Sequence, residues 1–288
     1  MSHDTTRRSG RSHGEAASVF TPRHGQARSV LRMISHYLRF NLSANMAYRG
    51  SFLIQVFGMV LNNSAFIIFW WFLLERIGGT LAGYQFADVM FLWALAATGF
   101  GASVVLLGNS PMISRIIYSG ELDVYLLQPK PVLTNLLSSR MIVSGWGDIA
   151  YGIILFVATQ PMTLSGWLLF FLFSFLMMMV VTAVRVAYHS LTFLFGNAEG
   201  FASVASEMII SFMIYPGTIF KGMSSVLLHS LIPAALVGHI PARIFKEFDP
   251  VLVLIVIAAD AAVVAVSVLL FRLGLRRYES GNRMATRM

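Results

Sequence analysis

The sequence predicts an all-α polytopic membrane protein with six transmembrane helices, and two observations support that prediction. Apolar side chains make up 57% of the 288 residues, whereas charged side chains make up only 12%. Soluble domains carry about 25% charged residues, so this chain has too little polar surface to cover its apolar side chains in water. The second observation is a set of six apolar runs of about 20 residues, the length that crosses a bilayer as a helix: Ser51–Leu74, Phe86–Leu107, Met141–Thr159, Leu164–Val184, Phe201–Phe220 and Val251–Phe271.

The chain before the first run divides into two parts. Residues 1–27 are polar and rich in arginine, lack the apolar core of a signal peptide, and are predicted to be a disordered basic arm. Residues 28–288 then form one transmembrane domain. At its start, basic residues recur at helical spacing (Arg28, Arg32, His36 and Arg39), and apolar residues lie on the other side of the same helix (Val30, Leu31, Ile34, Leu38 and Leu42). This pattern predicts an amphipathic helix in the membrane interface, and both a passive anchor and a moving mechanical element fit it.

One further apolar stretch, Val226–Val237, is too short to cross a bilayer and is interrupted by His229 and Pro233. Irregular backbone at membrane depth is tolerated where it is buried in protein or lines a cavity. This stretch therefore predicts a re-entrant or interfacial segment between the fifth and sixth spans, closed by Pro241.

The distribution of basic residues predicts the orientation. With six spans, 17 of the 21 Lys and Arg residues lie on the side that holds both termini, and 4 lie on the other side. Because cytosolic loops carry the excess of Lys and Arg, both termini are predicted to be cytosolic. A seventh span would place the basic C-terminal tail outside.

Ionisable side chains inside the predicted spans mark a candidate transport path. Asp148 lies in the third span, Glu207 in the fifth, and Asp260 near the centre of the sixth. An ionised side chain at mid-bilayer costs about 2.5–3.5 kcal/mol on insertion scales, so such groups face a cavity or a partner. A path and a structural pairing are equally compatible with Asp148 and Glu207, whereas a structural role fits Asp260 better.

Uncharged residues extend this set. Asn62 and Asn63 in the first span line a path or bridge helices, and bridging is the better fit. The run Met177–Met179 is interpreted as lipid-facing or packing residues rather than as a metal site. The predicted path residues are Asn62, Trp146, Asp148 and Glu207.

The sequence contains no recognisable catalytic motif. It lacks a phosphate-binding GxxxxGK[ST] loop and an HExxH zinc motif, and it has no cysteine. Serines are abundant, but no spacing favours an intramembrane Ser–His pair. The chain is therefore predicted to bind no cofactor or metal and to have no enzymatic activity, so its energy must come from a partner or from an ion gradient.

The loop between the second and third spans has the features of a docking element. Pro111 opens a short helix, whose apolar face around Arg115 is formed by Ile113, Ile116 and Ile117. Gly120 then ends it, and a second short segment carries two carboxylates before it is stopped by prolines. A docking surface for a cytosolic protein and an ordinary interfacial loop both fit this pattern. Its candidate residues are Arg115, Gly120, Glu121, Leu122, Asp123, Leu126 and Pro129.

Three motifs in this chain resemble those of the ABC type-two permeases, the membrane subunits of ATP-binding-cassette exporters in prokaryotes. Gly120–Asp123 followed by Leu126, Leu127 and Pro129 is similar to the "GELD…LLxP" signature of one branch of that family. Tyr215 and the prolines that follow it are similar to the "YP…iPa…Pa" region, and Gly274–Gly281 is similar to the closing "GLRRYeSg". The resemblance covers residues 30 to 282 in the family's order.

The resemblance implies a function that the residues alone do not. It implies a transmembrane subunit of an exporter that pairs with a second permease copy or a sister permease, in the plasma (inner) membrane of a bacterium. Two cytosolic ABC ATPase subunits would bind ATP and Mg, and the loop Gly120–Pro129 would receive their motion. The segment Pro216–Phe245 would form an extracellular re-entrant cap with Tyr215, Pro216, Pro233 and Pro241. The implied cargo is a small drug-like, lipophilic or cationic molecule.

Two other classes remain open from the sequence. An ion-coupled secondary transporter would relay protons through Asp148, Glu207 and Asp260, although the two halves of the chain show no internal repeat. A membrane scaffold without transport would need only structural partners for these acids. Dependence of transport on ATP separates the first two classes, and any substrate flux separates both from the third.

Overall fold

The computed structural model describes residues 26–81, 83–214 and 239–278. The regular secondary structure of these residues is helical, apart from an isolated antiparallel bridge between Leu81 and Tyr84. The elements are α1 (Gln26–Met46), α2 (Arg49–Arg76), α3 (Phe86–Leu106), η1 (Ser110–Met112), α4 (Ile113–Tyr118), α5 (Leu122–Leu126), α6 (Val132–Ser138), α7 (Gly145–Thr159), α8 (Leu164–His189), α9 (Thr192–Phe195), α10 (Glu199–Ile214), α13 (His239–Lys246) and α14 (Pro250–Leu275).

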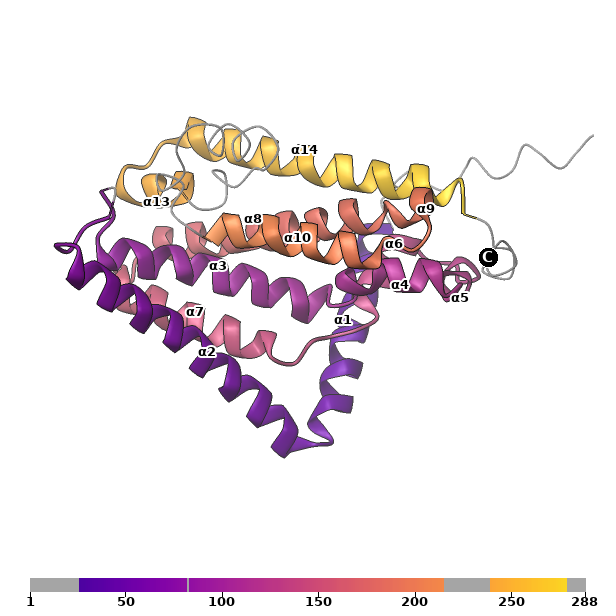
Figure 1. Ribbon diagram of the computed structural model, residues 1–288, viewed down its shortest axis with the longest axis horizontal. Coiled ribbons are helices and arrows are strands. Elements are labelled where there is room, and N and C mark those ends of the chain that lie inside the picture. Colours follow the sequence, from indigo (N-terminus) through magenta and orange to yellow (C-terminus); the bar gives the residue numbers. More distant parts are fainter. Residues whose placement is uncertain (1–25, 82, 215–238, 279–288) are drawn as a thin grey trace, which may run out of the picture.

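The long helices form a bundle with short helices at both ends (Figure 1). α3, α8, α10 and α14 run along its length, and α2 crosses it at an angle and forms a V with α1. The short helices α4, α5, α6 and α9 gather at one end, and α13 lies at the other. In the predicted orientation the end with α4 and α5 is cytosolic.

Four of the described helical segments are long and apolar enough to cross a membrane: α2, α3, α8 together with α9, and α14. α7 is apolar but has only 15 residues, and α10 has 16. The predicted all-helical membrane class is therefore confirmed, while the count of six spans stays a prediction.

The third predicted span begins later than its apolar run does, because α7 starts at Gly145 and not at Met141. The backbone N–H of Ile142 donates to the carbonyl of Val104 near the end of α3, at 2.9 Å, instead of to a carbonyl four residues earlier in its own segment. Residues 140–144 therefore link the end of the bundle that holds α4 and α5 to α7.

α3 forms the centre of the bundle and packs closely against α7 and α8. Small residues allow this approach, as is common between membrane helices. A Cβ placed on Gly101 of α3 would lie 2.6 Å from the carbonyl oxygen of Gly145 and 2.8 Å from Asp148 Cβ, both in the α7 region. The α3–α7 contact therefore depends on the missing side chain at Gly101.

Gly101→Ala is expected to lower the free energy of unfolding by about 1–3 kcal/mol, because the two helix backbones must separate to make room for the methyl group. The matched control is Gly58→Ala on α2, where an added Cβ has nothing within 4 Å. That control is expected to be neutral or to stabilise by up to about 1 kcal/mol through helix propensity. Thermal unfolding of both variants in one detergent measures the difference, and equal midpoints would contradict the close α3–α7 packing.

The outer faces of α2 and α14 are apolar and exposed. The exposed large apolar residues on α2 include Leu53, Ile54, Phe57, Leu61 and Phe72, and those on α14 include Val251, Leu254, Val266, Leu269 and Leu273. Surfaces of this size and composition are covered by lipid or by another protein. They are the natural lipid-facing or subunit-facing sides of the bundle.

α1 forms a helix where the amphipathic pattern predicted one, and its predicted position in the membrane interface stays a prediction. Met33 is buried, and Val30, Ile34, Leu38 and Leu42 are half-buried, whereas Leu31 of the predicted apolar face is 67% exposed. The predicted disordered arm falls outside the described residues except for Gln26 and Ala27, which open α1.

The predicted re-entrant segment falls largely outside the described residues. Tyr215, Pro216 and Pro233 are among those residues, and so is the stretch Val226–Val237. Pro241, at the end of the predicted cap, lies in α13. The cap itself stays a prediction.

Candidate functional site

A pocket of about 210 Å³ lies where α2, α3, α7 and α10 meet. We call it the central pocket. Its polar and aromatic lining comprises Asn62, Asn63, Trp93, Phe100, Asp148, Glu207 and Ser211. Asn63 and Asp148 are buried, whereas Asn62 and Glu207 are exposed. The exposed residues therefore line its mouth, and the buried ones form its floor.

A hydrogen-bonded chain of three side chains forms this floor. Trp93 Nε1 donates to Asn63 Oδ1 at 3.0 Å, and Asn63 Nδ2 donates to Asp148 Oδ1 at 2.8 Å. An indole N–H is only a donor, so it fixes the orientation of the Asn63 amide with the amide nitrogen toward Asp148. Asn63 thus bridges α2, α3 and α7, the role predicted for the Asn62–Asn63 pair, whereas the Asn62 amide contacts Met59 Sδ of its own helix.

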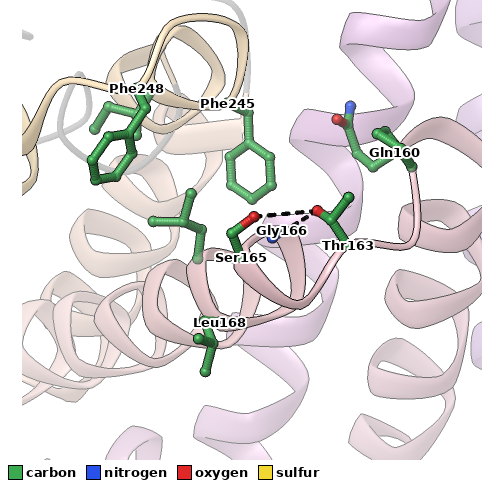
Figure 2. Close-up of a pocket in the computed structure, with 10 residues that line it drawn as sticks. Gln160, Thr163, Ser165, Gly166, Leu168, Phe245 and Phe248 are labelled. Atoms are coloured by element: carbon green, nitrogen blue, oxygen red, sulfur yellow. Dashed lines mark hydrogen bonds between the residues drawn. The ribbon is translucent and has the colours of Figure 1, made fainter.

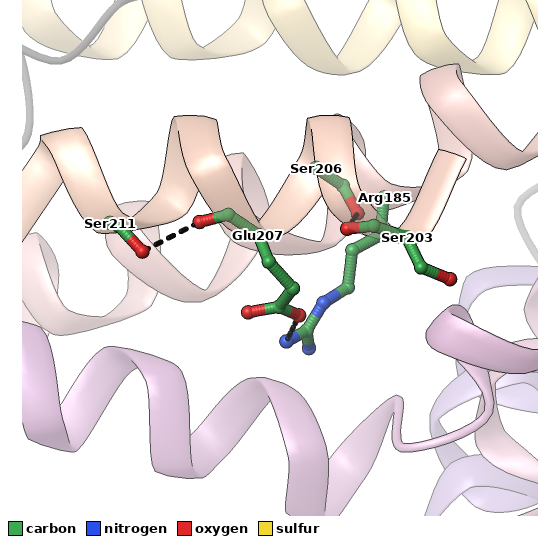
Figure 3. A network of polar contacts seen from close by, with 5 residues as sticks. All are labelled: Arg185, Ser203, Ser206, Glu207 and Ser211. Carbon is green, nitrogen blue, oxygen red and sulfur yellow. Dashed lines mark hydrogen bonds and ion pairs between the residues drawn. The ribbon is translucent and has the colours of Figure 1, made fainter. Parts of the chain in front are cut away.

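Beside the pocket, an ion pair joins α8 to α10 (Figure 3). Arg185 Nη2 lies 2.8 Å from Glu207 Oε1, with the Arg185 side chain 3% exposed and that of Glu207 54% exposed. The guanidinium carbon of Arg185 lies 5.0 Å from the centre of the Phe100 ring, a cation–π contact. Arg185 Nε and Nη1 have no hydrogen-bond partner among the described residues.

The second candidate site is the loop between α3 and α7, whose short helices are held in place by an apolar cluster. Ile113, Ile116, Ile117 and Leu122 are buried against residues of α6, α8, α9 and α14. The apolar face predicted for the first short helix is therefore confirmed. Gly120 ends that helix with φ +80°, a conformation that favours glycine. The loop is consequently a compact unit fixed to the bundle.

The surface of this loop is exposed at its tip. Arg115, Glu121, Leu127 and Pro129 are all exposed, whereas Asp123 is half-buried. Charged, apolar and proline side chains thus project together from a fixed base. We call this surface the loop tip.

A polar network ties α1 to the same loop. Tyr37 Oη of α1 donates to Asn135 Oδ1 of α6 at 2.7 Å, and Asn135 Nδ2 donates to Gln128 Oε1 at 3.0 Å. The ammonium of Lys130 lies 5.4 Å from the centre of the Tyr37 ring. Burial raises the pKa of the Tyr37 hydroxyl, with a smaller contribution from Tyr125, so Tyr37 remains a neutral donor at neutral pH.

Tyr37→Phe is expected to lower the free energy of unfolding by about 1–2 kcal/mol, because it removes the Tyr37 donor from the fully buried Asn135 while keeping the ring. Tyr48→Phe, at an exposed position just before α2, is the control and is expected to have no effect. Thermal unfolding in detergent measures both. An unchanged midpoint for Tyr37→Phe would mean that α1 is not fixed to α6 by this bond.

A second pocket, of about 440 Å³, lies at the opposite end of the bundle between the α7–α8 turn and α13 (Figure 2). Phe245 and Phe248 lie on one side of it, and Gln160 and Thr163 on the other. Thr163 Oγ1 caps α8 by accepting from the N–H of Gly166 at 3.1 Å. This pocket lies where the resemblance predicts the extracellular side.

A Ser–His pair does occur in the structure, although no sequence spacing pointed to one. Ser114 Oγ lies 2.8 Å from His189 Nδ1, and Thr192 Oγ1 donates to Ser114 Oγ at 2.8 Å. All three side chains are buried. A substrate cannot reach them, so we assign this cluster to the packing of α4 against α8 and α9.

Comparison with known proteins assigns the family. The sequence matches the family model of the ABC-2 family transporter proteins over residues 60–282. The chain belongs to the ABC-2 transporter family. The resemblance found in the sequence motifs is thereby confirmed, and the chain is a membrane component of a transporter and not itself the catalytic one. No curated protein and no solved structure matches it.

The ABC-2 match covers the loop tip and every lining residue of the central pocket except Met59. Three of the predicted path residues, Asn62, Asp148 and Glu207, come together at the central pocket. The fourth, Trp146, is half-buried elsewhere, with Nε1 3.3 Å from Met141 Sδ. Their roles in transport stay predictions.

Several residues of this candidate site were not among those predicted from the sequence. Trp93 and Phe100 looked like ordinary members of an apolar span, and only their contacts distinguish them. Arg185 was placed at the end of the fourth span, whereas α8 continues past it to His189. A signal for Arg185 was available, because an arginine next to an apolar run needs a partner if the helix continues.

Of the remaining residues, Met177 and Met178 are buried in α8, in agreement with packing. Asp260 is buried on α14, and its Oδ1 has no hydrogen-bond partner among the described residues. The part of the chain that the structure describes holds no group of three or more His, Cys, Asp or Glu side chains placed to bind a metal ion.

Proposed function

We propose that this ABC-2 protein is the transmembrane subunit of an ATP-driven exporter in a bacterial plasma membrane. It moves a small molecule out of the cytosol, while a separate ABC ATPase subunit binds ATP and Mg and hydrolyses the nucleotide. Two permease subunits, identical or related, form the transport path, and both termini of this chain are cytosolic.

The observation that carries this proposal is the loop tip on its fixed base. A docking surface transmits motion only if it does not yield locally, and the buried residues Ile113, Ile117 and Leu122 fix the loop to α8, α9 and α14. A force applied at Glu121 or Leu127 would therefore move the cytosolic ends of the long helices. The network through Tyr37 and Asn135 extends the same unit to α1.

The path proposed for the cargo includes the central pocket. α3, which forms one wall of the pocket, packs against α8 and α10, and both of these helices contact α4 at the base of the loop. A shift of α8 and α10 would therefore change the pocket. The pairing of Glu207 with Arg185 weighs against a proton relay, because Glu207 Oε1 is already engaged by Arg185 Nη2 at 2.8 Å. Asp260 does not line the central pocket.

The test is a pull-down of the tagged full-length chain from its host in mild detergent, followed by mass spectrometry and by transport in reconstituted vesicles. The proposal expects a stoichiometric ATPase subunit with a phosphate-binding loop, and substrate flux that requires ATP. Flux that runs on a proton gradient without ATP would support an ion-coupled transporter. The absence of both an ATPase and any flux would indicate a scaffold.

A further inference from the structure

We infer that the substrates of this transporter are compact protonated amines, bound in the central pocket by the carboxylate of Asp148. This inference rests on the proposed function and narrows its broad class of small molecules. Four features of the pocket support it: an unsatisfied acceptor, a fixed set of donors, an uncompensated charge and a small volume.

The unsatisfied acceptor is one oxygen of Asp148. The side chain is 4% exposed, and only Oδ1 is hydrogen-bonded, to Asn63 Nδ2 at 2.8 Å. Oδ2 has no partner among the described residues. A buried carboxylate oxygen without a donor is costly, because it has lost its water and received nothing in return. A donor brought by a ligand would remove that cost.

The fixed donors explain why the protein does not satisfy Oδ2 with the same residues. Trp93 Nε1 is committed to Asn63 Oδ1, and this bond directs the Asn63 amide nitrogen to Oδ1 of Asp148. Asn62, the other amide of the pocket, has its Nδ2 3.8 Å from Met59 Sδ. The Asn63 amide therefore positions Asp148, and the Asn62 amide lines the entrance of the pocket.

The charge balance favours a cation over an anion. The basic side chain of Arg185 lies over Phe100 of the pocket lining and is paired with Glu207 at 2.8 Å. Neither lysine nor arginine lines the central pocket among the described residues. An ionised Asp148 thus adds a negative charge that no basic side chain of the pocket offsets, and an ammonium group placed against Oδ2 would offset it and donate a hydrogen bond.

The volume limits the body of the ligand. At about 210 Å³, the pocket is smaller than the about 300–1,000 Å³ typical of sites for drug-sized molecules. The remaining walls are mostly apolar or aromatic, and the hydroxyl of Ser211 is engaged by the backbone carbonyl of Glu207. The apolar and aromatic walls are formed by Met59, Ala96, Ala97, Trp93, Phe100 and Ile210. The ligand is therefore an ammonium group on a short apolar or single-ring body, with the charge at the floor of the pocket.

The experiment measures binding of 2-phenylethylamine, which is protonated at neutral pH, to the full-length chain in lipid nanodiscs by equilibrium dialysis. Its neutral counterpart of nearly the same shape is 2-phenylethanol, and 3-phenylpropanoate is the anionic one. Wild-type protein is expected to bind the amine at least about tenfold more tightly than the alcohol, the difference for one charge-assisted hydrogen bond. Equal binding of amine and alcohol overturns the inference without any variant.

Two variants then locate the binding. Asp148→Asn is expected to weaken amine binding by at least about tenfold and to leave alcohol binding unchanged. Asp260→Asn is the matched control, since Asp260 on α14 is as buried as Asp148, at 4% exposed, but does not line the pocket. The control is expected to bind like the wild type, and an equal loss in both variants overturns the assignment to Asp148.

Failure of this inference is distinguishable from failure of the proposed function. If the amine does not bind but ATP drives the flux of another substrate in vesicles, only the substrate class is wrong. If the amine binds through Asp148 but no ATPase accompanies the chain and ATP drives no flux, the site stands and the exporter assignment is wrong.

Discussion

Simultaneous replacement of Glu121 and Asp123 by alanine is expected to lower ATP-driven export by at least about tenfold, because charged contacts at a docking interface are worth several kcal/mol when lost. ATP hydrolysis by the partner subunit is expected to continue. Both residues lie on short segments at the end of the bundle that holds α4 and α5 (Figure 1). Neither contributes to the central pocket, so the loss would arise at the coupling step and not at substrate binding.

The matched control for this double variant removes two exposed carboxylates at the other end of the bundle. Glu75 is the residue before the last one of α2, and Glu247 directly follows α13. The double replacement Glu75→Ala with Glu247→Ala therefore makes the same change of charge away from the loop. Export by the control is expected to match the wild type. Membrane insertion of all variants is checked by their amounts in the washed membrane fraction, and folding by elution as single species in detergent. Unaltered export in the Glu121 and Asp123 variant would refute the role of this loop in coupling.

Glu207→Ala is expected to lower the free energy of unfolding by about 3 kcal/mol, because it leaves the buried guanidinium of Arg185 without its ion-pair partner. The free-energy cost depends on which residue of the pair is removed. Arg185 is 3% exposed, whereas Glu207 is 54% exposed and borders the central pocket, so it is less enclosed by protein when it is left alone. Arg185→Leu, which removes the buried charge itself, is therefore expected to cost less than Glu207→Ala.

A double-variant cycle tests this asymmetry. Arg185→Leu combined with Glu207→Ala is expected to be more stable than Glu207→Ala alone, since no unpaired charge is left between α8 and α10. Glu199→Ala, in the first turn of the same helix, is the control for loss of a carboxylate from α10. The unfolding midpoints of the two single variants, the double variant and the Glu199→Ala control are measured against the wild type in one detergent. A single Arg185→Leu variant that is less stable than Glu207→Ala would mean that stacking on Phe100, and not the ion pair, dominates at this site.

Local sequence patterns predicted those parts of the structure that depend on neighbours along the chain. The apolar runs that became α2, α3, α8 and α14 exceed the length of a bilayer crossing, and lipid imposes helix on any such run. Gly120 ended a short helix because the required backbone conformation suits glycine. The face formed by Ile113, Ile116 and Ile117 was visible from its spacing alone.

The boundaries of two spans were less predictable, because hydrophobicity reports what a residue prefers and not what it contacts. Met141 and Ile142 are apolar, but the N–H of Ile142 bonds to Val104 and the helix starts only at Gly145. Arg185 is charged, but α8 continues through it because Glu207 on another helix supplies its partner. In both cases a contact between distant segments overrode the local preference.

The sequence by itself determined the class of this protein and the loop that carries its family signature, because both depend on composition and on the order of nearby residues. Only the tertiary structure decided how the polar residues within the bundle are used. Asn63, Trp93 and Asp148 lie on three different helices, and no periodicity in one segment reports the partner in another. The physical reason is that low-dielectric surroundings force buried polar groups into pairs, but which pairs form depends on how the helices pack.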